Sequence, residues 1–155
     1  MSNSWFGFEL GTSVAISGNV VVMGTPNRGT PDAAFVYVKP PTGWNNLSQS
    51  AVLVPSDGQS SCDNFGGSIS ISGNTVVVGA SQSSPNCSST GPGSVYVFVE
   101  PPGGWSGQVA ETANLTASDG MVGDALKLLH DGKFTEVRFM DSMSSPTFVQ
   151  ADRVR

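Results

Sequence analysis

Few residues of this chain have the types and spacing that catalysis requires. His130 is the only histidine, and no nucleophile accompanies it and its neighbour Asp131. Neither Gly-Thr-Ser-Val-Ala nor Gly-Gly-Ser-Ile-Ser completes the Gly-x-Ser-x-Gly pattern that places a serine nucleophile on a strand-to-helix turn. We therefore predict a protein that is not an enzyme and has no catalytic or cofactor-binding residues. His130 is interpreted as an ordinary residue at the end of a helix.

Four aspartates are the candidate ligands for a cation: Asp57, Asp63, Asp119 and Asp124. A calcium ion takes six or more oxygen ligands, and few oxygens lie near each other in sequence here. An Asp-Gly turn, in which the carboxylate accepts a hydrogen bond from its own backbone, explains these residues without a metal. We predict no metal site, with a weak calcium site at these turns as the alternative.

Two tryptophans and three asparagines could contact or carry sugar. Trp44 and Trp105 each follow a Pro-Pro-x-Gly sequence, so they are either stacking platforms for a sugar or residues that pack across their own turns. Their repetition at a turn favours packing. Asn46, Asn86 and Asn114 fit the glycosylation pattern, which we interpret as chance matches in a chain rich in Ser and Thr.

Composition limits the class of protein and its partners. A chain of 155 residues has room for one domain, and 19 glycines with 10 prolines suit short strands joined by tight turns. A net charge of −5 with only seven basic residues argues against nucleic acid and anionic membranes as partners. No apolar run is long enough for a membrane helix, and residues 1–5 do not resemble a signal peptide. The protein is thus cytosolic or its native N-terminus lies upstream, and the charge-poor, Ser- and Thr-rich body favours an exported protein.

A repeated β-hairpin organises the elements. The stretch FGGSISISGNTVVVGA alternates polar and apolar residues, turns at Gly73-Asn74 and returns as a β-branched run, and a matching hairpin turns at Gly18-Asn19. Each copy continues into two further strands. The predicted strands are residues 12–17, 20–24, 33–39 and 51–55 in the first unit, and 68–72, 75–79, 94–99 and 112–117 in the second.

The chain leaves the repeat after residue 124. The apolar residues of 125–129 have the spacing of a helix face, residues 134–140 alternate like a strand, and residues 147–154 could form another. We therefore divide the chain into two units, at about residues 1–58 and 59–124, and a divergent C-terminal segment of unknown role at residues 125–155. The fold class predicted is all-β, with two four-stranded antiparallel blades of the propeller type.

The repeated motifs resemble the FG-GAP repeat of integrin α-subunit propellers and of secreted bacterial proteins. The resemblance rests on Phe65-Gly66, on Gly79-Ala80 and on the phrases VYVFVEPPGGW and LTASDG, and it covers residues 11–124. It implies a β-propeller and an adhesion or binding role. In integrin-type blades calcium lies between the first two strands, where this chain has only the turns Gly18-Asn19 and Gly73-Asn74, so no calcium is expected there.

Two blades are too few for a closed propeller, which needs four to eight. The remaining blades are therefore expected from the same gene or from homo-oligomerisation. In a four-stranded blade the loop before the first strand and the loop between the second and third strands emerge at the same end. Cys62 lies in the first of these loops and Cys87 in the second, so we predict a disulfide between them, with two free thiols as the alternative.

These observations favour a non-enzymatic extracellular or cell-surface module that binds a protein or glycan. The two copies differ most in the loop between the second and third strands, and loops on a rigid scaffold are the usual recognition surface. We predict partner contacts from Ser81, Gln82, Asn86 and Ser88. The alternative is a carbohydrate-binding, lectin-like protein that completes its propeller by homo-oligomerisation.

Overall fold

The fold is all-β, as predicted. The protein was examined as a computed structural model that describes residues 10–26, 32–57, 63–81, 93–116, 125–128 and 137–140. Every regular element within these ranges is a β-strand. The described residues therefore contain no helix that is long and apolar enough to cross a membrane.

The first blade is a four-stranded antiparallel meander of β1 (Ser13–Ser17), β2 (Val20–Thr25), β3 (Ala33–Val38) and β4 (Ala51–Val54). Its first turn has Gly18 at φ 57°. A positive φ at the first central residue alone is the pattern of a type II′ turn, whose twist matches that of the flanking strands. The four strands predicted for this unit are confirmed.

The second blade repeats this arrangement with β5 (Phe65–Ser72), β6 (Thr75–Ala80), β7 (Ser94–Val99) and β9 (Ala113–Leu115). Gly73 has the same φ of 57° as its counterpart. Equivalent hydrogen bonds also recur. The backbone N–H of Ser50 donates to Val36 O and that of Thr112 donates to Val97 O, both at 2.7 Å.

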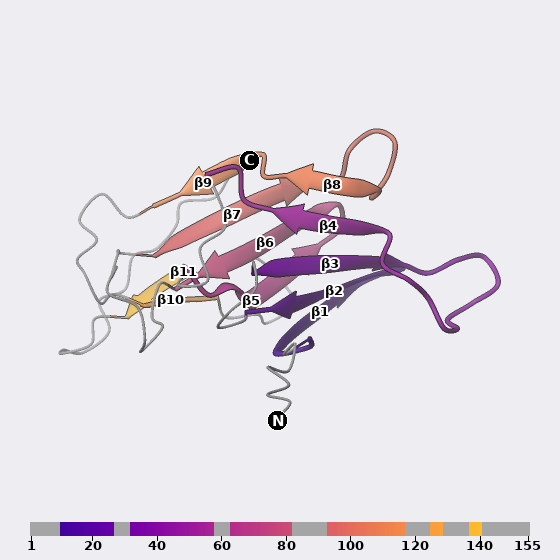
Figure 1. The fold of residues 1–155 in the computed structure, drawn as a ribbon, viewed down its shortest axis with the longest axis horizontal. Helices are drawn as coiled ribbons and strands as arrows, with labels where there is room; N and C mark the ends of the chain where they lie inside the picture. The colour runs from indigo at the N-terminus through magenta and orange to yellow at the C-terminus, as the bar shows by residue number, and fades with distance from the viewer. Residues whose placement is uncertain are drawn as a thin grey trace, which may run out of the picture.

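One strand was not predicted. β8 (Gly107–Ala110) lies in the connection between β7 and β9, yet it joins the first blade, where it pairs in parallel with β4 (Figure 1). The register places Ala51 opposite Gly107 and Leu53 opposite Val109. The predicted four-stranded antiparallel blade therefore forms, and its sheet gains a fifth, parallel strand that is supplied by the second blade and was not expected.

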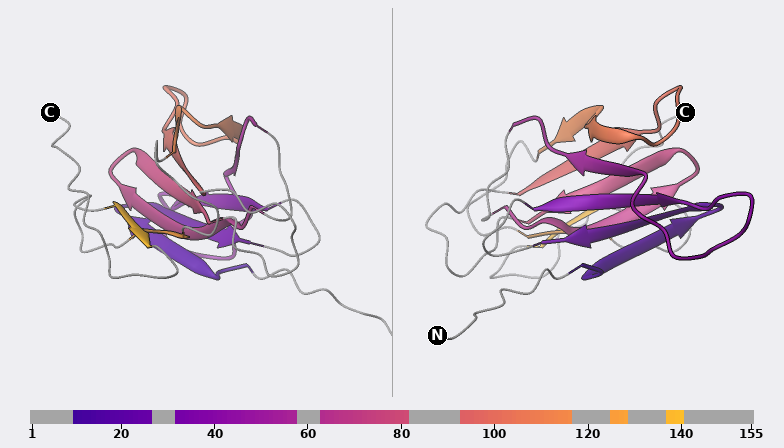
Figure 2. Two further views of the ribbon diagram at one scale, coloured as in Figure 1. Left: turned by 90° about the vertical axis from the view of Figure 1, so that its left-hand side faces the viewer. Right: turned by 45° about the vertical axis from the view of Figure 1, so that its right-hand side comes forward.

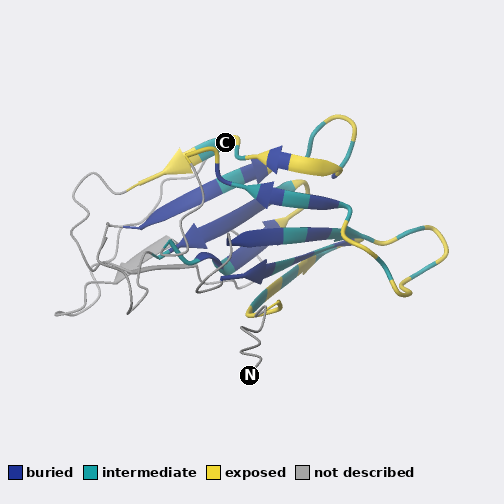
Figure 3. Ribbon diagram, in the orientation of Figure 1, coloured by how far each residue is buried: buried dark blue, intermediate teal, exposed yellow. Residues whose placement is uncertain are grey.

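The two blades pack face to face (Figure 2). Each blade has two faces, and residues paired across neighbouring strands lie on the same face. We name the faces by position: the back face of one blade packs on the front face of the next. The back face of blade 1 carries Val20, Val22, Ala34, Val36, Ala51 and Leu53, all buried. The front face of blade 2 carries Ile69, Ile71, Val76, Val78, Tyr96 and Phe98, also buried. Burial is concentrated between these faces (Figure 3).

The Phe-Gly pair of blade 2 fits closely against blade 1. The Phe65 ring contacts Tyr96 and Phe98 edge to face, with centroids 5.3 and 6.1 Å apart. Gly66 follows at φ 86°, and a Cβ atom on Gly24 would lie 2.0 Å from the Gly66 carbonyl oxygen. Because no side chain fits between these two backbones, the glycines are required by the approach of the blades.

The C-terminal segment contains a third, shorter sheet. β10 (Ala125–Leu128) pairs antiparallel with β11 (Val137–Met140), so the helix predicted at residues 125–129 is wrong over β10, whereas a strand within 134–140 is confirmed. A run of four residues is too short for helix and strand spacing to be distinguished. β10 lies against β5 and β6, as β5 lies against β1 and β2, so this hairpin takes the place of the first two strands of a third blade. The predicted strand at residues 147–154 and the interpretation of His130 lie outside the described residues.

Candidate functional site

The Ser-Asp-Gly turn of blade 1 is held by side chains of blade 2. Asp57 Oδ2 accepts a hydrogen bond from the Tyr96 hydroxyl at 2.9 Å and one from Asn114 Nδ2 at 3.2 Å. Glu111 accepts two bonds from Ser56, from the backbone N–H at 2.8 Å and from Oγ at 2.5 Å. The turn that follows β4 thus forms a polar contact between the blades.

This contact shifts the pKa values of its members. Burial and the hydrogen bond to the Asp57 carboxylate raise the pKa of Tyr96 well above its ordinary value of 10.0, because both disfavour the phenolate. Burial is the largest single influence on the pKa of Glu111 and raises it, but the hydrogen bonds from Ser56 and from the Glu111 backbone together outweigh burial and lower this pKa. Tyr96 therefore acts as a neutral donor and Glu111 as an ionised acceptor.

Of the four aspartates, Asp57 and Asp63 lie in the part of the chain that the structure describes. There, no three His, Cys, Asp or Glu side chains come together as they would around an ion. Asp57 is engaged by Tyr96 and Asn114 as described above, and Asp63 also has an interaction partner. Asp119 and Asp124 lie outside the described residues.

The predicted partner-binding loop begins at a fixed point. Asn64, at the end of the loop between the blades, has φ 54° and donates from Nδ2 to Ser81 Oγ at 2.9 Å. Its carbonyl accepts the Gly67 N–H at 3.0 Å, which closes a tight turn into β5. Ser81 opens the loop between β6 and β7, so the structure brings the end of one loop and the start of the other together at one end of blade 2, which we call the loop end. Gln82, Asn86, Ser88, Cys62 and Cys87 lie outside the described residues.

Asp32 was missed by the sequence interpretation. It is 1% exposed, and its Oδ2 accepts the backbone N–H of Phe65 at 3.1 Å. This buried carboxylate ties the residue before β3 to the first residue of β5 in the next blade. A single acidic residue directly before an apolar strand in a charge-poor body was the signal that could have indicated it.

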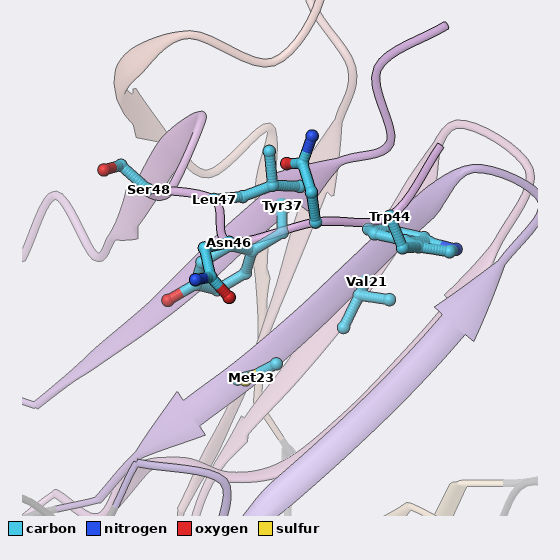
Figure 4. A pocket seen from close by; sticks show the side chains of 8 residues that line it. Val21, Met23, Tyr37, Trp44, Asn46, Leu47 and Ser48 are labelled. Atoms are coloured by element: carbon cyan, nitrogen blue, oxygen red, sulfur yellow. The ribbon is translucent and has the colours of Figure 1, made fainter. Parts of the chain in front are cut away.

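The two tryptophans have different surroundings. Trp105 is 5% exposed and belongs to the core between the blades. Trp44 is 47% exposed and lines an open pocket of about 550 Å³ on the front face of blade 1. Figure 4 shows the segment from Trp44 to Ser48 passing over Val21, Met23 and Tyr37, which with Asn45 complete the lining. Trp105 is therefore buried, as the packing interpretation predicts, but it packs in the core between the blades.

The glycosylation matches fall in unlike places. Asn114 lies on β9, as predicted, and its amide donates to Asp57. Asn46 is exposed at the rim of the Trp44 pocket, and Asn86 lies outside the described residues. The Asn114 amide is thus engaged in the contact between the blades.

Comparison with known proteins supports the repeat interpretation. The model of the family described as FG-GAP repeat matches residues 47–98. This range runs from β4 of blade 1 through β7 of blade 2, so the repeat in sequence is offset from the blade in space. No curated protein matches the chain. The match, the Phe65-Gly66 junction and the paired blades together show that this chain contains an FG-GAP repeat within a β-propeller-type module.

Proposed function

We propose that this module is a non-enzymatic binding or adhesion protein of the cell surface or extracellular space. It recognises a protein or glycan ligand through the loop end of blade 2. The hydrogen bond from Asn64 to Ser81 is the observation that carries this proposal, because it joins the end of the loop between the blades to the start of the loop between β6 and β7, which differs most between the copies. Loops joined on a rigid scaffold lose less conformational entropy on binding.

Two further features support the proposal. The charge-poor body rich in Ser, Thr and Gly suits an exported protein, and Cys62 and Cys87 lie in the two loops that Asn64 and Ser81 connect. A disulfide between them would fix the loop end further in an oxidising compartment. Titration of the denatured, unreduced protein from an oxidising host is expected to give close to no free thiol, and two thiols per chain would contradict the compartment assigned.

The binding role is tested on an array of extracellular proteins and glycans. A ligand found there is measured again with Gln82→Arg at the loop end and with Thr42→Arg as the control at the opposite end. Gln82→Arg is expected to weaken binding by about tenfold, which is about 1.4 kcal/mol, while Thr42→Arg leaves it unchanged. Loss of binding in the Thr42 variant alone would place the ligand at the wrong end for this proposal.

A second candidate is the carbohydrate-binding, lectin-like function, favoured by the Trp44 pocket. A half-exposed indole beside the amides of Asn45 and Asn46 has the stacking and hydrogen-bonding groups that sugars require. Titration with a panel of oligosaccharides, followed by tryptophan fluorescence, should give a response that Trp44→Ala abolishes. A response that persists in this variant would exclude the pocket.

A further inference from the structure

Comparison of the two repeat units shows that residues 45–48 lack a strand pairing that their counterparts in the second unit have. Ser50 and Thr112 occupy equivalent positions in the two blades, because each donates its backbone N–H to the third strand of its own blade. Each also accepts a backbone N–H with its side-chain oxygen: Ser50 Oγ from Val38 and Thr112 Oγ1 from Val99. Counting back from these anchors makes residues 45–48 the counterparts of β8. β8 is paired with the outer strand of the preceding blade. Within the described residues, 45–48 makes no backbone hydrogen bond.

The other end of the module lacks the complementary partner. Among the strands that the structure describes, β4, the outer strand of blade 1, pairs with β8, whereas β9, the outer strand of blade 2, is the last strand of its sheet. Leu53 on β4, beside its cross-strand partner Val109, is fully buried, whereas its counterpart Leu115 on β9 is 52% exposed. Val99 on the same back face is 37% exposed. β9 therefore offers an open strand edge with an uncovered leucine.

We propose that residues 45–48 of one copy pair in parallel with β9 of a second copy, as β8 pairs with β4. The register that the repeat dictates places Leu47 opposite Leu115, in the positions of Val109 and Leu53. Gln49 then takes the place of Glu111 at the next Ser-Asp-Gly turn. Each chain carries both halves of the contact, so identical copies satisfy each other head to tail.

The covered surface is the outer half of the back face. β10 lies against β5 and β6, so the inner half already has an occupant. On the outer half Val95 of β7 is also buried, and the exposed part consists of Val99 at the end of β7 and Leu115 on β9. On the donor side, Trp44 and residues 45–48 form the outer part of the front face and line the open pocket. This inference does not depend on the loop-end function. It uses the segment that lines the Trp44 pocket, so a second copy bound there would compete with a sugar for this pocket.

The test uses two single variants that break opposite halves of one contact. Sedimentation velocity of the whole chain over a range of concentrations is expected to show association, and Leu47→Asp and Leu115→Asp are each expected to sediment as monomers. An equimolar mixture of the two should form a one-to-one complex, because the intact donor of one meets the intact acceptor of the other. Leu47→Val, which supplies the residue found in β8, should associate like the parent chain.

Several results would overturn the proposal. A chain that is monomeric at every concentration has no such contact. Association that survives Leu47→Asp, or a mixture that stays monomeric, would show a contact of another kind. Thermal melting of each variant checks the fold. Leu115 is exposed and Leu47 lies outside the core, so both variants are expected to melt close to the parent chain.

Discussion

At the residue scale, the first hairpin turn of each blade contains a glycine, as the sequence predicted, and the backbone conformation of this glycine restricts which residues fit there. Gly73 and Gly18 share φ 57°, and no atom lies within 4 Å of a Cβ built on either. A side chain there meets open space, so any cost of substitution comes from the backbone conformation alone. This separates strain from packing, two effects that most core substitutions mix.

Gly73→Val is expected to lower the free energy of unfolding by roughly 1–3 kcal/mol, because a β-branched residue at positive φ is strained. Gly103→Val is the matched control, since its Cβ also meets no atom and its φ is not positive. Urea unfolding monitored by tryptophan fluorescence measures both. Equal losses in the two variants would show that strain at the turn is not the cause.

At the scale of elements, eight predicted strands form and pair in the predicted order. Alternation and β-branched runs predict such strands well because each is stabilised within its own blade. β8 was missed because its partner is β4 of the other blade, and its local sequence, Gly-Gln-Val-Ala, gives a weak strand pattern. The repeat alone does not predict this pairing. It identifies the equivalent segment in the other copy only after the pairing of one copy is known.

The candidate site was predictable to a smaller extent. Ser81 is placed where the blade topology required, at the same end as the loop between the blades. The hydrogen-bond partners of Asp57 and Asp32 were not predictable, because these partners, Tyr96 and Phe65, belong to the next blade and are brought near by packing. Sequence patterns indicate pairing within a blade but contain no signal for single contacts between blades.

The contact between the turn after β4 and β7 should make stability fall in alkali. The pKa of Tyr96 is raised by burial and by Asp57, so above the ordinary value of 10.0 the unfolded chain releases a proton that the folded chain keeps. The stability that Tyr96 contributes is complete below pH 10 and decreases as the pH rises further.

Tyr96→Phe tests this, with the advantage that the equivalent residue of blade 1 is already Phe35. At neutral pH the variant is expected to lose roughly 1–2 kcal/mol with the hydrogen bond to a charged acceptor. Its unfolding free energy should then depend less on pH above 10 than that of the parent chain. An unchanged alkaline dependence would assign the effect to other groups.

At the scale of the whole molecule, the packing of the two blades requires glycines at a close backbone contact as well as apolar side chains. Gly24 of β2 meets the backbone of Gly66, whereas its counterpart Gly79 meets only the Ser68 hydroxyl, with a Cβ-to-Oγ distance of 2.2 Å. The same repeat position therefore lies against another blade in the first copy and against its own blade in the second.

Gly24→Ala is expected to cost about 3 kcal/mol or more, because its Cβ would lie 2.0 Å from a backbone oxygen that cannot move aside. Adding Ser13→Ala should not restore stability, since the Gly66 carbonyl remains. In contrast, Gly79→Ala should recover most of its loss when combined with Ser68→Ala, which leaves ordinary contacts of 3.6 Å to the Cβ atom and 3.8 Å to the carbonyl oxygen of residue 68. Thermal melting of the four proteins distinguishes the two sites, and rescue at Gly24 would contradict the close approach of the blades.

The parallel pairing of β4 with β8 has a consequence for synthesis of the chain. The N-terminal strands leave the ribosome first, and β4 then has an uncovered edge until β8, much later in the sequence, has emerged. An open strand edge is a site for pairing with neighbouring nascent chains. Contacts between residues distant in sequence also form slowly. The interval between translation of these two strands is therefore the period in which this protein is most exposed to aggregation, and a chaperone that shields strand edges would act there.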